Sequence, residues 1–305
     1  MKNRKSSPYP STRKTSDTLI VAADGPLLAY LISALPGRSR NRLKAVLKAR
    51  QILVDGRPIG QFDHPLRQGQ KVEVQWQRNS QPVPMQGLTI VHEDPDIIVV
   101  NKPANLLTVA TDKEKRRTAY AILSSYVKSE HPDNRIFIVH RLDRETSGLL
   151  LFARNEKTKR LLQESWETTI RQRSYVAVVV GEITEEEGTV TSWLTESRAL
   201  KVYSSQNPGQ GQKAITHFRK LRASSAYTLL QLNLDTGRKH QIRVHMQDIG
   251  HPVAGDRKYG TSTEKPINRL ALHAQTLVFT HPVTDRLCHF TTPVPPLFVK
   301  LFASP

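Results

Sequence analysis

Cysteine is almost missing from this 305-residue chain, and its single example, Cys288, excludes internal disulfides and a thiolate-rich zinc site. No apolar run approaches the roughly 20 residues that a membrane-spanning helix needs. Residues 1–14 lack the apolar stretch of a secretory signal. Glycine-rich phosphate loops of the GxxxxGK[ST] and GxGxxG types are missing as well. We therefore expect a cytoplasmic protein that does not bind membranes and uses no nucleotide cofactor.

Acidic residues are also few. Lysine and arginine total 45 against 27 aspartate and glutamate residues, which gives a net charge of +18 and a pI near 10.1. Such an excess favours a polyanionic partner, because basic side chains bind phosphates regardless of base sequence. We interpret the charge as that of a nucleic-acid-binding protein, although composition alone does not separate DNA from RNA. A basic protein without such a partner is the alternative.

The first 80 residues hold 15 lysine or arginine residues and 5 acidic residues, so they carry more than half of the net charge. We expect a disordered basic arm over residues 1–22 and a small domain over residues 23–78. Its pattern predicts helices over 26–35 and 40–50, the second capped by Ser39. Asp55-Gly56 predicts the turn of a hairpin over 51–59, and residues 70–75 alternate as a closing strand.

Basic side chains gather on the second predicted helix and just before it. This order of elements resembles the S4-type RNA-binding domain, a likeness that covers about residues 24–76. The resemblance implies RNA contacts from a set of exposed cations, namely Arg38, Arg40, Arg42, Lys44 and Lys48. The alternative is a solvated helix face on an ordinary small domain.

A polar linker over residues 79–87 separates this domain from a larger one over residues 88–303. There we expect two strands over 88–103 with a turn at 93–96, a helix over 118–128 and adjacent strands at 136–139 and 149–152. A helix capped by Asn155 should reach about Gln172, and strands should follow at 174–180 and 227–234. Strands and helices alternate without a regular rhythm, so the pattern predicts an α+β fold.

The segment HRLDRETSG, residues 140–148, places one carboxylate, Asp143, between Arg141 and Arg144 in the loop between two predicted strands. Nearby cations favour the ionised form, and an ionised carboxylate can act as a nucleophile. The same residues could equally form a structural ion-pair loop. Local chemistry by itself favours that second interpretation.

Two later segments could complete a site. RSY, residues 173–175, begins an apolar strand with Tyr175, and a tyrosine there usually serves packing. TGRKHQIRVHM, residues 236–246, places Arg243 away from the apolar face of a short helix, from which it could bind a carboxylate or a phosphate. A purely electrostatic basic helix remains the alternative.

A metal site is not expected. His240, His245 and His251 are close in sequence, but their spacing matches no familiar zinc pattern and no carboxylate pair accompanies them. Cys288 has no activating base nearby in sequence and is interpreted as a small buried hydrophobic residue.

Together these segments resemble the RluA-type pseudouridine synthases. HRLDRETSG, RSY and TGRKHQIRVH occur in the order seen in that family, along with NKPA at 101–104, GHPVAGD at 250–256 and RLALHA at 269–274. The likeness spans about residues 88–300. It departs at Asn105, where the family usually has glycine, and at Arg173, where lysine is common.

The resemblance implies the pseudouridine synthase fold, with a mixed, largely antiparallel sheet and flanking helices, and an RNA substrate. It implies that Asp143 is the indispensable carboxylate, that Arg243 pairs with it, and that Tyr175 stacks on the uracil. Arg141 would fill the space that the displaced base leaves, and Arg144, Arg238 and Lys239 would contact RNA.

The family reaction needs no cofactor or metal, and we expect a monomer. Large-subunit ribosomal RNA is the first candidate substrate and tRNA the second. A non-catalytic RNA-binding or ribosome-assembly factor on the same fold is the alternative function, and a glycosidase that releases uracil is a third.

Overall fold

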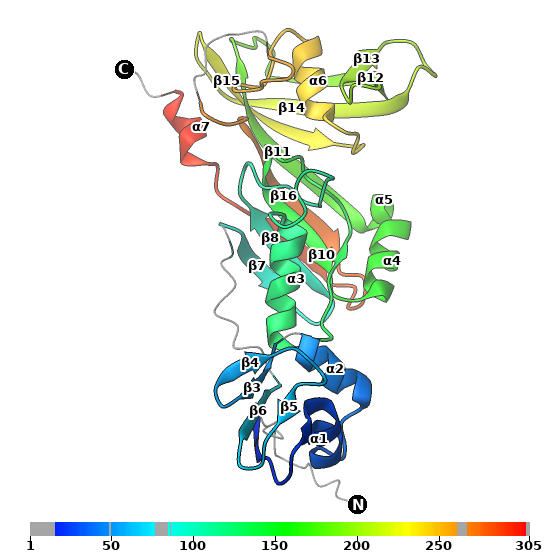
Figure 1. The fold of residues 1–305 in the computed structure, drawn as a ribbon. Helices are drawn as coiled ribbons and strands as arrows, with labels where there is room; N and C mark the ends of the chain where they lie inside the picture. The colour runs from blue at the N-terminus through cyan, green and yellow to red at the C-terminus, as the bar shows by residue number, and fades with distance from the viewer. Residues whose placement is uncertain (1–15, 49, 77–84, 86, 261–266, 303–305) are drawn as a thin grey trace, which may run out of the picture. The chain divides into compact units, whose positions relative to one another are not determined.

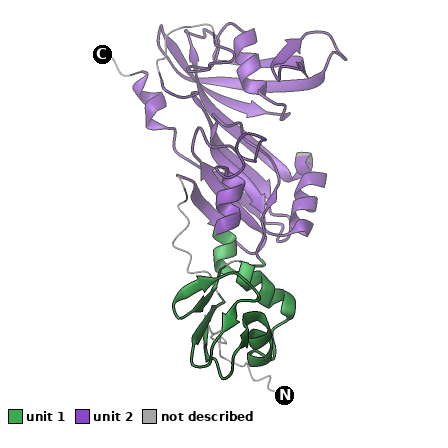
Figure 2. Ribbon diagram, viewed as in Figure 1, with its two compact units in different colours: residues 1–83, 126–133 green, residues 84–125, 134–305 purple. Residues whose placement is uncertain are grey.

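The computed structural model describes residues 16–48, 50–76, 85, 87–260 and 267–302 (Figure 1). The chain divides into two compact units, residues 1–83 with 126–133 and residues 84–125 with 134–305 (Figure 2). Most of the predicted linker over 79–87 lies outside the described residues. In the part of the chain that the structure describes, no helix is long and apolar enough to cross a membrane.

The first unit contains a four-stranded sheet in the order β1-β6-β3-β4, a short β2–β5 pair and two helices. The elements are β1 (Ser16–Ile20), β2 (Gly25–Pro26), α1 (Leu27–Ala34), α2 (Arg40–Lys48), β3 (Ile52–Val54), β4 (Arg57–Ile59), β5 (Pro65–Leu66) and β6 (Lys71–Gln75). Leu31, Leu43 and Val72 are buried in its core because apolar positions recur with the period of each element. The predicted order of helices, hairpin and strand is confirmed. The likeness to the S4 domain stays a prediction.

Local signals explain these elements. The backbone N–H of Arg42 donates to Ser39 Oγ at 3.3 Å, so Ser39 caps α2 as predicted. Asp55 and Gly56 both have positive φ, 50° and 78°, which is the backbone of a tight two-residue hairpin turn.

The predicted disordered arm over residues 1–22 extends too far. Residues 16–20 form β1, which pairs antiparallel with β6, and Val21 is buried in the core. Trp76 Nε1 also donates to Asp17 Oδ2 at 2.6 Å. This strand was missed because its partner lies more than fifty residues later, which a local pattern does not reveal. Residues 1–15 lie outside the described part of the chain.

The second unit is built on a sheet of eleven strands among the described residues, in the order β13-β12-β14-β15-β11-β16-β10-β8-β7, with β17 beside β16 and β9 beside β10. The strands are β7 (Thr89–Glu93), β8 (Ile97–Lys102), β9 (Phe137–Ile138), β10 (Ser147–Ala153), β11 (Ile170–Val180), β12 (Glu187–Glu196), β13 (Val202–Ser205), β14 (Gln212–Ala223), β15 (Tyr227–Leu234), β16 (Leu272–Thr280) and β17 (Leu287–Thr291). Only β10 and β16 run parallel among these neighbours. The predicted α+β class with a largely antiparallel sheet is confirmed.

Helices line this sheet. They are α3 (Ala119–Glu130), whose last turn groups with the first unit, α4 (Glu156–Glu164), α5 (Trp166–Thr169), α6 (Gln241–Asp248) and α7 (Pro296–Lys300). Helix α4 contacts β9 and β10, α5 contacts β11, and α6 contacts β12, β13 and β14. Asn155 caps α4, since its Oδ1 accepts the Thr158 N–H at 2.8 Å.

The helix after Asn155 is shorter than predicted. It breaks at Ser165, and the backbone becomes extended at Ile170, so Gln172 lies in β11. The run Thr168-Thr169-Ile170 is β-branched, which disfavours helix and favours strand.

Candidate active site

Asp143 lies in the loop between β9 and β10, at a cavity of about 520 Å³ in the second unit. The cavity is also lined by Tyr175 from β11, by Trp166 from α5 and by residues 234–242, which connect β15 to α6. Segments that are distant in sequence therefore line one cavity together with Asp143. The prediction that Asp143 is displayed on a loop between strands is confirmed.

Hydrogen bonds fix the backbone on both sides of Asp143. Thr108 Oγ1 donates to the Leu142 carbonyl at 2.7 Å and accepts the Leu142 N–H at 3.2 Å. Lys102 Nζ donates to the Arg144 carbonyl at 3.3 Å, and the Thr146 N–H donates to the Asp143 carbonyl at 3.2 Å. The carboxylate is thus carried on a backbone that its neighbours hold in place.

Lys102 is fully buried, and its ammonium also donates to the carbonyls of Pro103 and Leu106 at 3.1 and 2.8 Å. Burial lowers the pKa of Lys102 from 10.5 to about 7, the charge of Asp143 raises it, and that of Arg269 lowers it further. The segment NKPA belongs to the family resemblance, but nothing in the sequence indicated that its lysine, Lys102, would bind the backbone of the Asp143 loop.

The loop enters β10 at a point of close backbone contact. Gly148 has φ +115°, and a Cβ at this position would lie 2.2 Å from the Ala274 carbonyl oxygen of β16. Beside it, Ser147 Oγ contacts His273 Nδ1 at 2.7 Å and accepts a bond from Arg269 Nη2 at 2.6 Å. The glycine of HRLDRETSG is therefore required by the parallel β10–β16 pairing.

Tyr175 lines the same cavity, and burial raises the pKa of its phenol above the usual 10.0. Near it, the Arg173 guanidinium lies 5.7 Å from the Trp166 ring centre, and the rings of Trp166 and His140 are 5.0 Å apart. This wall offers flat faces on which a planar base can stack. The structure thus brings Tyr175 and Asp143 to one cavity.

Arg243 does not form its predicted ion pair with Asp143. Its Nε and Nη2 donate to the two carboxylate oxygens of Asp256, both at 2.7 Å, and Nη2 also lies 3.3 Å from Glu145. Burial opposes charge at Asp256, but the bonds from Arg243 outweigh it and hold the pKa of Asp256 below its usual value. Asp143 contributes electrostatically to Arg243, so the cation lies near the carboxylate without bonding to it.

His240 Nε2 lies 3.8 Å from Asp143 Oδ2. Burial lowers the pKa of His240 from 6.5 to about 4, against the opposing effect of Asp143. His240 Nδ1 lies 2.8 Å from the Tyr259 hydroxyl. Sequence reasoning considered His240 only as a metal ligand and missed Tyr259, Asp256 and Thr108.

The predicted RNA contacts of this unit divide into two groups. Arg141, Arg238 and Lys239 line the cavity, whereas Arg144 is exposed but not among the lining residues. Lys239 forms an ion pair with Glu196, and Arg238 Nε donates to the Lys213 carbonyl at 3.2 Å. Arg141 has no such bond among the described residues, which leaves its guanidinium available to a ligand.

In the first unit, Arg40, Lys44 and Lys48 are exposed along α2. Arg38 lies over the Trp76 ring at 4.4 Å from its centre, and Arg42 is 3.8 Å from Asp133. The last two cations therefore also have contacts within the protein. Whether any of the five binds RNA stays a prediction.

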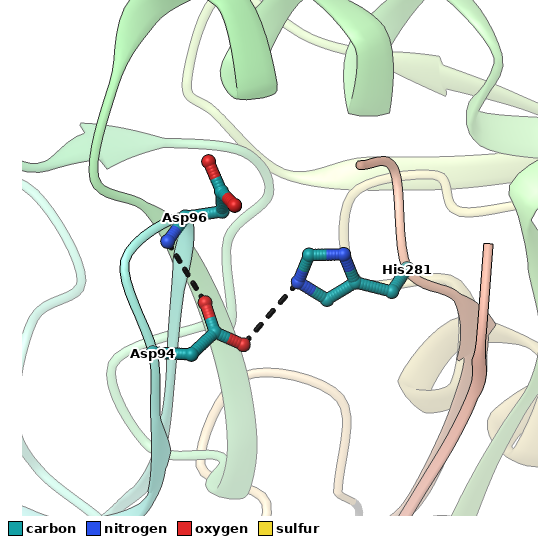
Figure 3. Close-up of side chains that lie close together, drawn as sticks. All are labelled: Asp94, Asp96 and His281. Carbon is teal, nitrogen blue, oxygen red and sulfur yellow. Dashed lines mark hydrogen bonds and ion pairs between the residues drawn. The ribbon is translucent and has the colours of Figure 1, made fainter. Parts of the chain in front are cut away.

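Asp94, Asp96 and His281 also gather closely, at the β7–β8 turn (Figure 3). Two backbone N–H groups, from Val283 and Thr284, donate to His281 Nδ1 at 3.2 and 3.1 Å, so Nε2 carries the proton and donates to Asp94 at 3.2 Å. Metal binding through Nε2 would need the opposite tautomer. The three residues therefore form a hydrogen-bonded cluster that stabilises the turn.

Asn105, the departure from the family pattern, has φ +64°. This left-handed backbone explains the usual glycine, and asparagine is the residue that next best tolerates it. The substitution therefore keeps the turn after NKPA.

Comparisons with known proteins agree with the sequence resemblance. The profile of the family described as RNA pseudouridylate synthase matches residues 96–248. The chain is 35% identical over 228 residues to the uncharacterized RNA pseudouridine synthase YhcT of Bacillus subtilis, covering 73% of this chain and 74% of that protein. It is 32% identical over 314 residues to ribosomal large subunit pseudouridine synthase D of Haemophilus ducreyi, covering 95% and 94%.

The fold also matches a solved structure, that of human RNA pseudouridylate synthase domain containing 4. The TM-score is 0.58 at 24% sequence identity, and the match covers 70% of this chain and 91% of the human one. At this identity the likeness concerns the fold alone.

Proposed function

This chain belongs to the RluA-type family of RNA pseudouridine synthases, isomerases that convert uridine to pseudouridine in RNA, and from that premise we propose that Asp143 is the carboxylate on which the reaction depends. The reaction breaks the N1–C1′ bond of uridine, rotates the base and joins C5 to C1′. A proton leaves C5 and another is taken up at N1, so atoms and charge balance within the substrate.

The observation that carries this proposal is the difference between the two carboxylates lining the cavity. Asp235 is 57% exposed and lies 2.9 Å from His217, which is itself exposed. Asp143 is only 32% exposed, its backbone is held by Thr108 and Lys102, and it faces His240. A fixed carboxylate can either attack C1′ or remove a sugar proton, because both roles require a positioned anion.

Tyr175 is proposed to stack on the uracil. Its raised pKa keeps the phenol protonated at neutral pH, so stacking and hydrogen-bond donation come before any role in removing the C5 proton. Tyr175 could therefore accept the C5 proton only after it has passed its own phenol proton to a linked group.

The target uridine must leave its base stack to reach the cavity, at a cost of a few kcal/mol. Arg141 is proposed to fill the vacated space, since it is exposed at the cavity and a guanidinium stacks on bases. Arg144, Arg238 and Lys239 are proposed to contact phosphates nearby.

Large-subunit ribosomal RNA is the proposed substrate, with tRNA second. The name of the Haemophilus ducreyi relative, to which nearly the whole chain aligns, supports this assignment. The net charge of +18 is consistent with a large polyanion. Pseudouridine mapping in total RNA from a deletion strain and its parent would identify the target, and a missing site in tRNA alone would contradict the proposal.

Asp143→Asn tests the catalytic assignment. We expect pseudouridine formation to be lost, while RNA affinity and thermal stability stay near those of the parent. Asp235→Asn is the matched control and should keep most of the activity, because it removes a carboxylate from the same cavity. Turnover by Asp143→Asn would contradict the proposal, and release of free uracil by the parent protein would indicate a glycosidase.

A further inference from the structure

Tyr259 contacts both His240, which faces Asp143, and the buried cation Arg243. Its hydroxyl lies 2.8 Å from His240 Nδ1, and its ring centre is 5.1 Å from the Arg243 guanidinium. The tyrosine is 2% exposed, and the backbone N–H of Val202 donates to the same hydroxyl at 3.0 Å. Tyr259 does not line the cavity, so substrate contact is not its role, although its hydroxyl contacts His240, which does line it.

These contacts fix the proton positions. The Tyr259 oxygen already accepts the Val202 N–H, and its own proton has one acceptor among the described residues, His240 Nδ1. Tyr259 therefore donates, and Nδ1 accepts. In a neutral imidazole the proton must then be on Nε2, the nitrogen that faces Asp143.

The backbone supports the same orientation. His240, the N-cap residue immediately before α6, has φ 54° and ψ 16°, a left-handed conformation that is uncommon outside glycine. The strain is retained at a residue that lines the cavity, and strained backbone recurs at functional sites. It turns the imidazole between Tyr259 and Asp143, where its ring meets the tyrosine ring at 73°.

We propose that His240 is a positioning residue for pseudouridylation: Tyr259 fixes its tautomer, and its Nε2–H holds the Asp143 carboxylate toward the substrate. The inference rests on the proposed role of Asp143. The 3.8 Å separation is longer than a hydrogen bond, and such contacts commonly tighten when substrate binds. Since the pKa of His240 is about 4, the ring acts at neutral pH as a neutral donor.

Three variants test the contributions of the Tyr259 hydroxyl and the His240 donor separately. Tyr259→Phe removes one oxygen and keeps the ring against Arg243. His240→Gln keeps an N–H donor of similar reach, and His240→Leu removes it. The last two share the same backbone strain, so their difference isolates the donor.

The assay uses full-length protein in excess over total RNA from a deletion strain, which contains the unmodified target whichever RNA carries it. We expect single-turnover rates to fall about 10- to 100-fold in Tyr259→Phe and His240→Leu, since small misplacements of a reacting group cost this much. His240→Gln should stay within about fivefold of the parent, a rescue consistent with an amide donor. Dissociation constants for the RNA should change less than about twofold, because His240 and Tyr259 are proposed to orient the Asp143 carboxylate rather than to bind RNA.

The double variant supplies the decisive comparison. If Tyr259 acts through the His240 tautomer, Tyr259→Phe should slow the His240→Gln protein little further, because glutamine has no tautomer to select. Additive losses, or a full rate in His240→Leu, would overturn the proposal. Asp143→Asn is measured alongside: if it stays active, the function proposed for Asp143 fails, whereas an inactive Asp143→Asn with a fully active His240→Leu refutes the positioning role alone.

Discussion

Arg243 and Asp256 form a buried, two-bond ion pair, with both donor–acceptor distances at 2.7 Å and side-chain exposures of 3% and 0%. Asp256 also accepts the backbone N–H groups of Lys258 and Tyr259, at 2.8 and 3.0 Å. The pair thus ties α6 to the segment that carries Tyr259. Arg243 itself is not among the residues that line the cavity, so we infer that the pair stabilises the segments behind Asp143.

Removing one partner of this pair should destabilise the protein strongly. We expect Asp256→Ala to lower the free energy of unfolding by about 3 kcal/mol, because the buried guanidinium loses both of its 2.7 Å bonds and keeps only the longer contact with the partly exposed Glu145. Glu196→Ala, which breaks the partly exposed pair with Lys239, is the control and should cost much less, because solvent screens the pair. Urea unfolding measures both, and equal losses would contradict the assignment of Arg243–Asp256 as a structural pair.

Gly148→Ala should be severe for a steric reason. The added methyl would lie 2.2 Å from the Ala274 carbonyl oxygen, and the three nearest atoms all belong to the Ala274 backbone, so no side chain can move to make room. We expect a loss of more than about 3 kcal/mol in unfolding free energy, or failure to fold.

Gly209→Ala separates this steric effect from the cost of positive φ. Gly209 has φ +89° with no atom within 4 Å of the added carbon, so its substitution should cost about 1–2 kcal/mol. Similar losses at the two glycines would show that backbone conformation, rather than the β10–β16 contact, explains Gly148.

The sequence predicted elements whose signals are local. Asp55-Gly56 indicated the hairpin turn, Asn155 the helix start, and HRLDRETSG a loop between strands, all of which are confirmed. The family motifs likewise indicated the fold. Neither the local signals nor the family motifs could indicate which side chains contact one another after folding.

The partner of Arg243 illustrates the limit. Asp143 and Asp256 are both plausible carboxylates from the sequence, and only the packing of α6 and the loop after it decides for Asp256. β1 was missed for the same reason, because its pairing with β6 is a long-range contact. The tautomer of His240 depends on Tyr259 and Val202, which no spacing connects.

Acid should destabilise the protein below pH 6.5. Burial lowers the pKa values of four histidines from 6.5, to about 3 for His140 and about 4 for His240, His245 and His273. Between pH 6.5 and 4 the unfolded chain therefore binds more protons than the native protein, so stability falls as pH falls.

Urea unfolding between pH 4 and 7 measures this slope. His245→Gln should reduce the proton uptake on unfolding near pH 5 by about one, since His245 is fully buried between Ser192 and Thr216. A free energy of unfolding that is constant across this range would contradict the expected neutral, buried histidines.

The resemblance of the first unit to the S4-type domain predicts that its RNA binding depends on the face of α2 formed by Arg40, Lys44 and Lys48, which are exposed and spaced four residues apart. Replacing all three with glutamine should weaken binding to a large-subunit ribosomal RNA transcript and flatten its salt dependence. The slope of log K against log salt should become shallower by about 2, at roughly 0.7 per lost phosphate contact.

The same replacement at Lys157, Lys159 and Arg160 on α4 removes an equal charge and is the matched control. A specific phosphate-binding face on α2 requires the α2 variant to lose clearly more affinity and more salt dependence than the α4 variant, because direct contacts release counterions whereas distant charge acts only through the screened field. Equal losses would mean that net charge, rather than the position of these cations, attracts the RNA. An unchanged slope in the α2 variant would remove that helix from the RNA interface.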